Sequence, residues 1–198
     1  KVRVTPKLKE VAEGEPVPKP ETTKSSLWVD ALYYADKLRS IPDISWMVNN
    51  LDHSAIMISE FGGVRFKSET DFQSTEELRA KGQHVIVDLK TSKDPFSKQW
   101  IQRKGQKGQY ASFVEGHKYD LQAYIYRYAY LQNYGVMPNY YIVVVGKSEE
   151  APVEIINMNG TDSDEYYARI LDTYSEQFQR IKMGEVAPQG CGYCKNCR

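Results

Sequence analysis

An acid and an amine lie two residues apart at the end of an apolar run, in the segment VIVDLK of residues 85–90. If this run is a β-strand, its side chains alternate between the two faces, so Asp88 and Lys90 project from the same face. An acid and an amine placed in this way could hold a divalent cation and orient or activate a nearby water. A plain salt bridge at a strand end has the same spacing, so the motif needs support from other residues.

A second carboxylate, Asp71, lies at the end of the preceding predicted strand, Val64–Phe72. Antiparallel pairing of the two strands could place Asp71 beside Asp88. Two clustered carboxylates repel each other, and a hard cation such as Mg²⁺ would neutralise them. Magnesium commonly binds one or two carboxylates together with waters and substrate phosphate. In the alternative interpretation, Asp71 is an exposed acid at a strand end.

A third group lies in the tyrosine-rich segment 119–134, which is predicted to be a helix that ends at Gly135. Gln122 and Tyr126 are four residues apart and therefore adjacent on one helical face. The same edge continues through Tyr119 and Tyr130. The residues predicted to pack inward are Leu121, Ile125, Tyr128 and Leu131. An ordinary amphipathic helix would show the same pattern.

Hydrophobic spacing and turn residues predict the elements that position these side chains. Helices are predicted over residues 27–40, around 46–48, and over 119–134 and 164–183; strands are predicted over 54–60, 64–72, 83–89, 140–146 and 152–158. Residues 91–115 show no clear period and are predicted to form a long mobile loop. This order of elements predicts a mixed α/β or α+β domain.

Composition excludes several classes of protein. The chain has 198 residues, 41% of them hydrophobic, and 26 Lys and Arg balance 26 Asp and Glu. These values exclude collagen-like, coiled-coil and wholly disordered chains. No apolar run approaches the roughly 18 residues that span a bilayer, so no membrane partner is expected. No signal-peptide pattern opens the chain, and its start at Lys1 suggests that upstream residues are missing.

Three segments divide the chain. Residues 1–25 are rich in proline and are predicted to be an extended arm or linker. Residues 26–187 are predicted to form one domain, and residues 188–198 form a tail that contains all three cysteines, Cys191, Cys194 and Cys197. The spacing of these cysteines is too compressed for a disulfide framework and favours thiolates in a reducing cytosol. Zinc bound by three thiolates and an outside ligand, or a plain reduced tail, would both fit.

Taken together, three segments resemble the PD-(D/E)XK nuclease superfamily, in its RecB-like branch and its phage-encoded, RecE-like exonucleases. They are FKSETDF around Asp71, VIVDLKTS around Asp88 and Lys90, and YDLQAYIYRYAY with Gln122 and Tyr126. The resemblance covers roughly residues 46–198. It implies that residues 26–187 form a nuclease domain with a restriction-endonuclease-like core, in which helices flank a central mixed β-sheet.

The resemblance also implies the roles of individual residues. Asp71 and Asp88 would bind one or two Mg²⁺ or Mn²⁺ ions, with the backbone carbonyl of Leu89 as a further ligand. Lys90 would position or deprotonate the attacking water, or stabilise charge on the phosphate.

Gln122 and Tyr126 would orient the metal-bound water, Lys90 or the DNA backbone. The reaction would be hydrolysis of a phosphodiester bond that leaves a 5′-phosphate.

Two features depart from the superfamily pattern. Related exonucleases place a glutamate or histidine upstream of the first aspartate as another metal ligand, and the spacing here points to His53, with Glu60 as the second choice. A lone histidine is also commonly structural. Thr70 stands where the superfamily name expects a proline.

The C-terminal cysteines allow one further expectation. Some RecB-like nucleases hold an iron–sulfur cluster with three C-terminal cysteines and one upstream. This chain has three cysteines in total, so a complete four-cysteine cluster would need a ligand from outside it.

The resemblance implies a cytoplasmic enzyme of a bacterial host, encoded by a phage or prophage. The enzyme would resect linear duplex DNA ends so that a single-strand annealing protein can pair the exposed strand, and it would form a homo-oligomeric ring. Two alternatives are an endonuclease on the same core and a catalytically silent nucleic-acid-binding module.

The predicted loop after the catalytic strand is basic although the chain as a whole is neutral. Residues 89–118 contain seven Lys and Arg and two acids. The residues expected to contact DNA are Lys93, Lys98, Arg103, Lys104, Lys107 and Lys118. Three aromatic residues of the same segment, Trp100, Tyr110 and Phe113, could stack on bases at a frayed end. A solvated basic surface is the simpler alternative.

Neutralising Arg103, Lys104 and Lys107 together should weaken DNA binding and flatten its dependence on salt, because fewer counterions are released. Binding measured over a series of salt concentrations tests this. An unchanged salt slope would remove the hypothesis.

Overall fold

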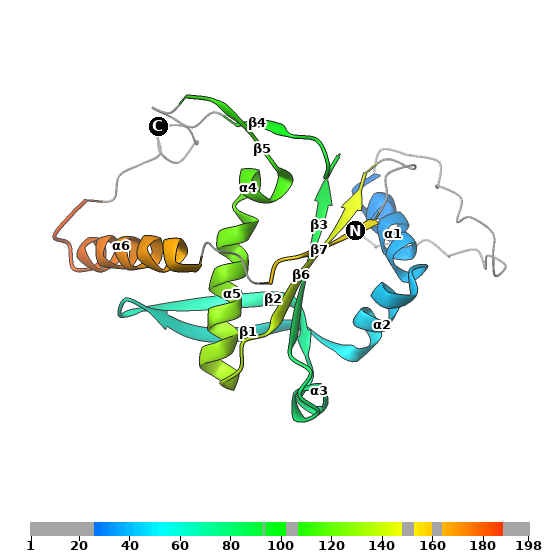
Figure 1. Ribbon diagram of the computed structural model, residues 1–198, viewed down its shortest axis with the longest axis horizontal. Helices are drawn as coiled ribbons and strands as arrows, with labels where there is room; N and C mark the ends of the chain where they lie inside the picture. Colours follow the sequence, from blue (N-terminus) through cyan, green and yellow to red (C-terminus); the bar gives the residue numbers. More distant parts are fainter. Residues whose placement is uncertain (1–25, 93, 102–106, 148–152, 160–163, 188–198) are drawn as a thin grey trace, which may run out of the picture. The chain divides into compact units, whose positions relative to one another are not determined.

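The computed structural model describes residues 26–92, 94–101, 107–147, 153–159 and 164–187. The chain divides into two compact units, residues 1–49 and residues 50–198. The second unit contains all of the candidate catalytic residues and is shown with the first in Figure 1. The predicted N-terminal arm, residues 1–25, and the cysteine-containing tail, residues 188–198, lie outside the described residues.

A five-stranded mixed β-sheet forms the centre of the second unit, with the strand order β1-β2-β3-β6-β7 (Figure 1). These strands are β1 (Leu51–Phe61), β2 (Val64–Ser74), β3 (Val85–Ser92), β6 (Asn139–Gly146) and β7 (Val153–Asn157). Neighbouring strands are antiparallel except β3 and β6, which are parallel. A parallel pair requires a long crossover connection, and this one includes helix α5 (Tyr119–Tyr134). The predicted mixed fold with a central sheet and flanking helices is confirmed.

A tight turn joins β1 to β2. Phe61 and Val64 form the last pair of the ladder, and the two glycines between them, Gly62 and Gly63, have φ of 53° and 75°. A two-residue hairpin loop with positive φ at both positions matches the strand twist, and glycine adopts it without strain. The turn also packs closely against helix α6 (Asp164–Lys182), where the side chain of Gln179 donates to the Gly62 carbonyl at 2.6 Å.

Helix α5 spans the predicted residues and ends at Gly135, whose φ is 74°. Its most buried apolar residues, Ala123, Tyr124, Ala129 and Tyr130, differ from the four predicted to face inward. Three of those four, Leu121, Ile125 and Tyr128, are half-buried and pack around a second cluster formed with α6. The prediction of the helix is therefore correct, but its most buried residues lie one or two positions along the chain from the predicted ones.

The prediction of a long loop over residues 91–115 was wrong. The segment contains strands β4 (Gln99–Ile101) and β5 (Gln109–Ala111), which pair with each other, and helix α4 (Phe113–His117). Elements of three to five residues are too short to show a hydrophobic period. The sequence did contain one signal, since Ser112 and Glu115 form a capping box at the start of α4.

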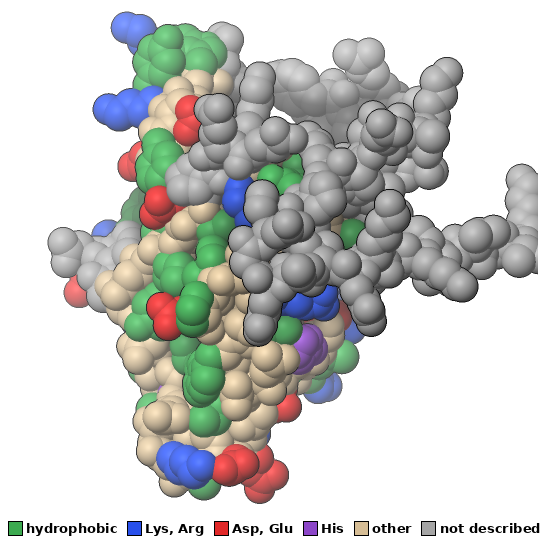
Figure 2. Space-filling model, turned by 90° about the vertical axis from the view of Figure 1, so that its right-hand side faces the viewer, with side chains coloured by type: hydrophobic (Ala, Val, Ile, Leu, Met, Phe, Trp, Pro, Cys, Tyr) green, Lys and Arg blue, Asp and Glu red, His purple; other side chains and the backbone are tan. Residues whose placement is uncertain are grey.

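A second short helix, α3 (Glu76–Ala80), was also not predicted. Thr75 caps it by accepting a hydrogen bond from the Leu78 N–H. Lys81 pairs with Glu77 across one helical turn, and the lower end of Figure 2, where α3 lies, shows basic and acidic side chains next to each other.

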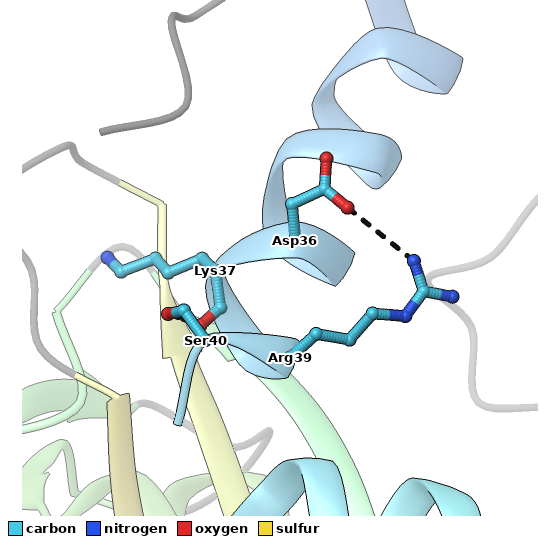
Figure 3. Close-up of polar contacts among 4 residues, drawn as sticks. All are labelled: Asp36, Lys37, Arg39 and Ser40. Carbon is cyan, nitrogen blue, oxygen red and sulfur yellow. Dashed lines mark hydrogen bonds and ion pairs between the residues drawn. The ribbon is translucent and has the colours of Figure 1, made fainter. Parts of the chain in front are cut away.

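The first unit contains helix α1 (Ser26–Arg39), and helix α2 (Pro42–Asn50) follows at its boundary, as the spacing predicts. At the end of α1, the Ser40 hydroxyl donates to the Lys37 carbonyl at 2.7 Å. Arg39 forms an ion pair with Asp36 at 3.5 Å (Figure 3). None of the helices in the described part of the chain combines the length and the hydropathy that crossing a bilayer requires.

Side-chain amides of α5 cover the free edge of β1. The Glu60 N–H donates to Gln132 Oε1 at 2.8 Å, and Gln132 Nε2 donates to the Glu60 carbonyl at 2.9 Å. Asn133 donates to the Ile58 carbonyl at 2.9 Å. These amides take the place of a further strand, so the edge is less available for pairing with another chain.

Gln132→Ala should lower the free energy of unfolding by about 1–2 kcal/mol, since two hydrogen bonds are lost, and should increase self-association through β1. Urea unfolding and sedimentation measure the two effects. Gln177→Ala, at an exposed position of α6, is the matched control. Equal behaviour of the two variants would show that the amide does not protect this edge.

Candidate active site

Asp88 lies on β3, between β2 and β6, and only 3% of its surface is exposed. On one side it pairs with Ile142 of β6, and along its own strand it follows the buried Ile86 and Val87. Burial raises the pKa of Asp88 to about 6; the Lys90 ammonium opposes this shift, and the charge of Asp71 adds to it. The strand therefore holds a carboxylate where ionisation is costly.

Lys90 forms an ion pair with Oδ2 of Asp88, so the two side chains project from one face of β3 as the alternation predicts. The Lys90 side chain is 19% exposed. Its ammonium also lies 5.0 Å from the centre of the Tyr119 ring, in a cation–π contact. The amine is thus fixed between a carboxylate and an aromatic face.

The structure brings Asp71 to Asp88, as antiparallel pairing of their strands predicts. The ladder between β2 and β3 pairs Gln73 with Ile86 and Phe72 with Val87, and the next residues along it are Asp71 and Asp88. At this point a side chain replaces the backbone as acceptor, because the Leu89 N–H donates to Oδ2 of Asp71 at 2.7 Å. The two carboxylates therefore meet where the regular ladder ends.

Helix α5 delivers Gln122 to the same place. Gln122 Nε2 donates to Oδ1 of Asp88 at 3.2 Å and fixes the orientation of the carboxylate. Tyr126, one turn later, makes an edge-on contact with Tyr140, with 6.3 Å between ring centres. In this structure Gln122 therefore contacts Asp88, whereas Tyr126 contacts the aromatic ring of Tyr140 in β6.

Two tyrosines near the candidate site, Tyr140 and Tyr119, were not predicted to take part in it. The hydroxyl of Tyr140 is buried without a hydrogen-bond partner among the described residues, and burial, followed by the charge of Asp88, raises its pKa. Tyr119 holds Lys90 and is itself contacted by the rings of Phe113 and His117 at 5.0 and 5.2 Å. Tyr140 was missed because the parallel pairing of β3 and β6 was not predicted; the position of Tyr119 three residues before Gln122 was a usable signal.

The described residues fit a hard divalent cation through oxygen ligands. Oδ2 of Asp88 is buried and is contacted by the Lys90 ammonium. Two clustered carboxylates, with the Leu89 carbonyl in the same strand, form the type of donor set that Mg²⁺ or Mn²⁺ prefers. Across the described residues no three His, Cys, Asp or Glu side chains gather as metal ligands.

His53 lies on β1 opposite Phe72, and the two rings are 4.7 Å apart. This places it one pair along the ladder from Asp71. Its role as a metal ligand stays a prediction.

The sequence matches, over residues 33–198, a family described as a PDDEXK-like domain of unknown function (DUF3799). The chain belongs to this family. The superfamily resemblance inferred from Asp71, Asp88-x-Lys90 and Gln122-x-x-x-Tyr126 is therefore confirmed.

A crystal structure of a putative exonuclease from Eubacterium rectale is similar to this PDDEXK-like chain, with 25% sequence identity and a TM-score of 0.69. The similarity covers 85% of this chain and 59% of that one, so this chain spans less than two thirds of that protein. The crystal structure of SSO0001 matches with 15% identity and a TM-score of 0.41, over 87% of this chain and 69% of that one. No curated protein matches the chain.

The basic residues predicted to contact DNA are described in part. Lys98, Lys107 and Lys118 are exposed on the segment between β3 and α5 of the PDDEXK-like domain. The other three, Lys93, Arg103 and Lys104, lie outside the described residues, as do Cys191, Cys194 and Cys197.

A groove of about 950 Å³ lies elsewhere, between the β1–β2 hairpin and the end of α6. Its lining includes Phe66 and Phe178 and none of the candidate catalytic residues. In this PDDEXK-like domain the candidate active site is therefore identified by its clustered charged side chains and not by a large groove.

In EDTA, the wild-type protein should lose stability as the pH rises through about 6, because Asp88 then ionises against the cost of its burial. The contribution of this group is complete below its ordinary pKa of 3.8 and is lost above its folded value. Asp88→Asn keeps the shape of the side chain and should remove this part of the pH dependence. Urea unfolding at about pH 5 and about pH 8 measures it.

Mn²⁺ should raise the unfolding midpoint of the wild type and leave that of Asp88→Asn unchanged. Glu69→Gln, at an exposed position of β2, is the control. If the stability of Asp88→Asn in EDTA depended on pH as that of the wild type does, the pH dependence would not come from Asp88.

Proposed function

We propose that the chain is a metal-dependent nuclease that hydrolyses phosphodiester bonds of DNA and acts as an exonuclease on linear duplex ends. One observation carries the proposal: Asp71, Asp88, Lys90 and Gln122, from two strands and one helix, converge at the point where the β2–β3 ladder ends. Membership of the PDDEXK-like family supports the nuclease assignment.

Asp71 and Asp88, together with the Leu89 carbonyl, are the residues that would hold Mg²⁺ or Mn²⁺. When bound, such an ion polarises a phosphate oxygen and lowers the pKa of a coordinated water. Gln122 keeps one oxygen of Asp88 occupied, so the carboxylate presents its other oxygen in a fixed direction. That oxygen is buried and forms the ion pair with Lys90, so a bound cation and the ammonium would lie close together.

Lys90 is the group placed to act on the reacting atoms. Its ammonium lies beside the Asp88 carboxylate and is supported by the Tyr119 ring. From there it could hold or move a proton at the attacking water, or stabilise charge that develops on the phosphate oxygens. Tyr126 would contribute by packing against Tyr140. Burial raises the pKa of the Tyr140 hydroxyl, and the charges of Asp88 and Asp71 raise it further.

The finer parts of the proposal rest on the resemblance to RecE-like exonucleases. The similar crystal structure is that of a putative exonuclease, which supports action at DNA ends. On this basis we also propose a phage or prophage role in recombination or repair in the bacterial cytoplasm. A single-strand annealing protein would be the partner, and the nuclease would be a homo-oligomer.

Asp88→Ala and Lys90→Ala should each reduce cleavage by about 10²- to 10⁴-fold while leaving DNA binding in place, because each removes a group that acts in the reaction. End-labelled linear duplex DNA with Mg²⁺, Mn²⁺ or EDTA measures the rate. Lys81→Ala, at the exposed end of α3, is the matched control.

Closed circular duplex DNA separates the alternatives. An exonuclease degrades the linear substrate alone, whereas an endonuclease on the same core also cuts the circle. Binding without cleavage of either substrate by the wild type would show a catalytically silent module.

A further inference from the structure

The β4–β5 ribbon presents two large aromatic side chains to solvent. Trp100 and Tyr110 are cross-strand partners and are 58% and 67% exposed. Their ring centres are 5.0 Å apart at an angle of 68°. Neither belongs to a buried cluster of the described residues, so packing within this chain does not account for them.

The orientation of Trp100 is fixed by the backbone beside it. A Cβ atom at Gly108 would overlap Cζ2 of the indole, so the ring lies directly against the backbone of residue 108. A side chain at this position would displace the ring. One face of the indole is therefore held against the ribbon while much of its surface stays in solvent.

Three exposed lysines lie in the same segment of the chain as this aromatic pair. Lys98 and Lys107 lie on the ribbon segments, and Lys118 lies at the junction of α4 and α5; all three are exposed. Asp94 lies four residues before Lys98, and the acids near α4 and α5, Glu115 and Asp120, share a hollow of about 170 Å³ with Lys107 and Lys118.

Local hydrogen bonds occupy both of the acids near α4 and α5. Glu115 accepts from the backbone and hydroxyl of Ser112, which lowers its pKa, and the charges of Lys98 and Lys118 lower it further. Asp120 accepts from the Tyr167 hydroxyl and the Leu121 N–H. Over residues 89–118 as a whole, seven Lys and Arg against two acids favour a polyanion as the partner of this segment.

A short chain of contacts connects the ribbon to the candidate active site. Ile101 of β4 packs over Gly116 of α4, where a Cβ would lie 2.7 Å from Cδ1 of Ile101. The ring of His117 in α4 stacks on Tyr119, whose face holds the Lys90 ammonium. Figure 1 shows the ribbon beyond α4, at the end of α5 that carries this junction.

We propose that Trp100 and Tyr110 form a stacking platform for unpaired nucleobases, so that the enzyme engages DNA ends through single-stranded or frayed nucleotides. Exposed aromatic faces flanked by lysines are what single-stranded nucleic acid requires, whereas bases inside an intact duplex already stack on each other. The proposal rests on the proposed nuclease function and adds the form of DNA that the enzyme recognises.

The first test uses the wild-type protein without substitution. In EDTA, oligothymidylate should bind more tightly than an abasic strand of the same length and charge, by roughly 5- to 150-fold for each stacked base. Fluorescence anisotropy of end-labelled strands measures both affinities. Equal affinity for the two strands would overturn the platform and leave the nuclease proposal standing; failure to bind any DNA would count against both.

The second test compares variants. Trp100→Ala should lose most of the preference for oligothymidylate over the abasic strand, and Trp100→Phe should keep a large part of it. Gly108→Ala should also reduce the preference, because it displaces an indole that is still present. Tyr174→Ala removes a comparably exposed aromatic residue from α6, 52% exposed, and should leave the preference unchanged.

An unchanged preference in Trp100→Ala would overturn the proposal. Sedimentation of the same variants separates a further possibility. A change in self-association together with unchanged oligonucleotide binding would assign the aromatic pair to contact between copies of the chain instead.

Discussion

A carboxylate buried in the middle of a β-sheet is the constraint on which the rest of the second unit depends. Asp88 is 3% exposed and lies on a strand with neighbours on both sides. Taking a carboxylate out of water costs several kcal/mol unless other groups compensate. The compensation comes from Lys90 in the same strand and from the Gln122 amide in α5. Both must be placed within hydrogen-bond or ion-pair distance, and most of the surrounding fold serves that placement.

The parallel pairing of β3 and β6 is the feature that brings α5 to the carboxylate. A parallel pair needs a long connection that returns across one face of the sheet, and α5 forms part of that connection. Its two ends are fixed separately: Gln132 and Asn133 bind the edge of β1, while Tyr119 contacts Phe113 and His117 of α4. Gln122 lies between these anchors, so its position is set by the helix as a whole.

The sequence predicted those elements whose position in the fold follows from a local pattern of side chains. The alternation in VIVDLK placed Asp88 and Lys90 on one face, and the helix over residues 119–134 was predicted with both of its ends. The ribbon of β4 and β5 was not predicted, because three-residue strands owe their conformation to each other and to α4. Tyr140 was missed for a related reason: its place beside the site depends on the pairing of strands separated by more than forty residues, as the Ile86–Tyr140 pair shows.

The charged groups of the candidate site, two acids and one base, each have a neutral partner as well. Asp71 accepts from a backbone N–H, Asp88 accepts from an amide, and Lys90 is held by an aromatic ring. Each of these partners is neutral, and the charge of Asp88 is balanced by its ion pair with Lys90. A second lysine near Asp71 would satisfy the carboxylates and compete with the metal, and an acid in place of Tyr119 would compete for Lys90. An aromatic face stabilises an ammonium group without accepting a proton from it, whereas a carboxylate would form a competing ion pair.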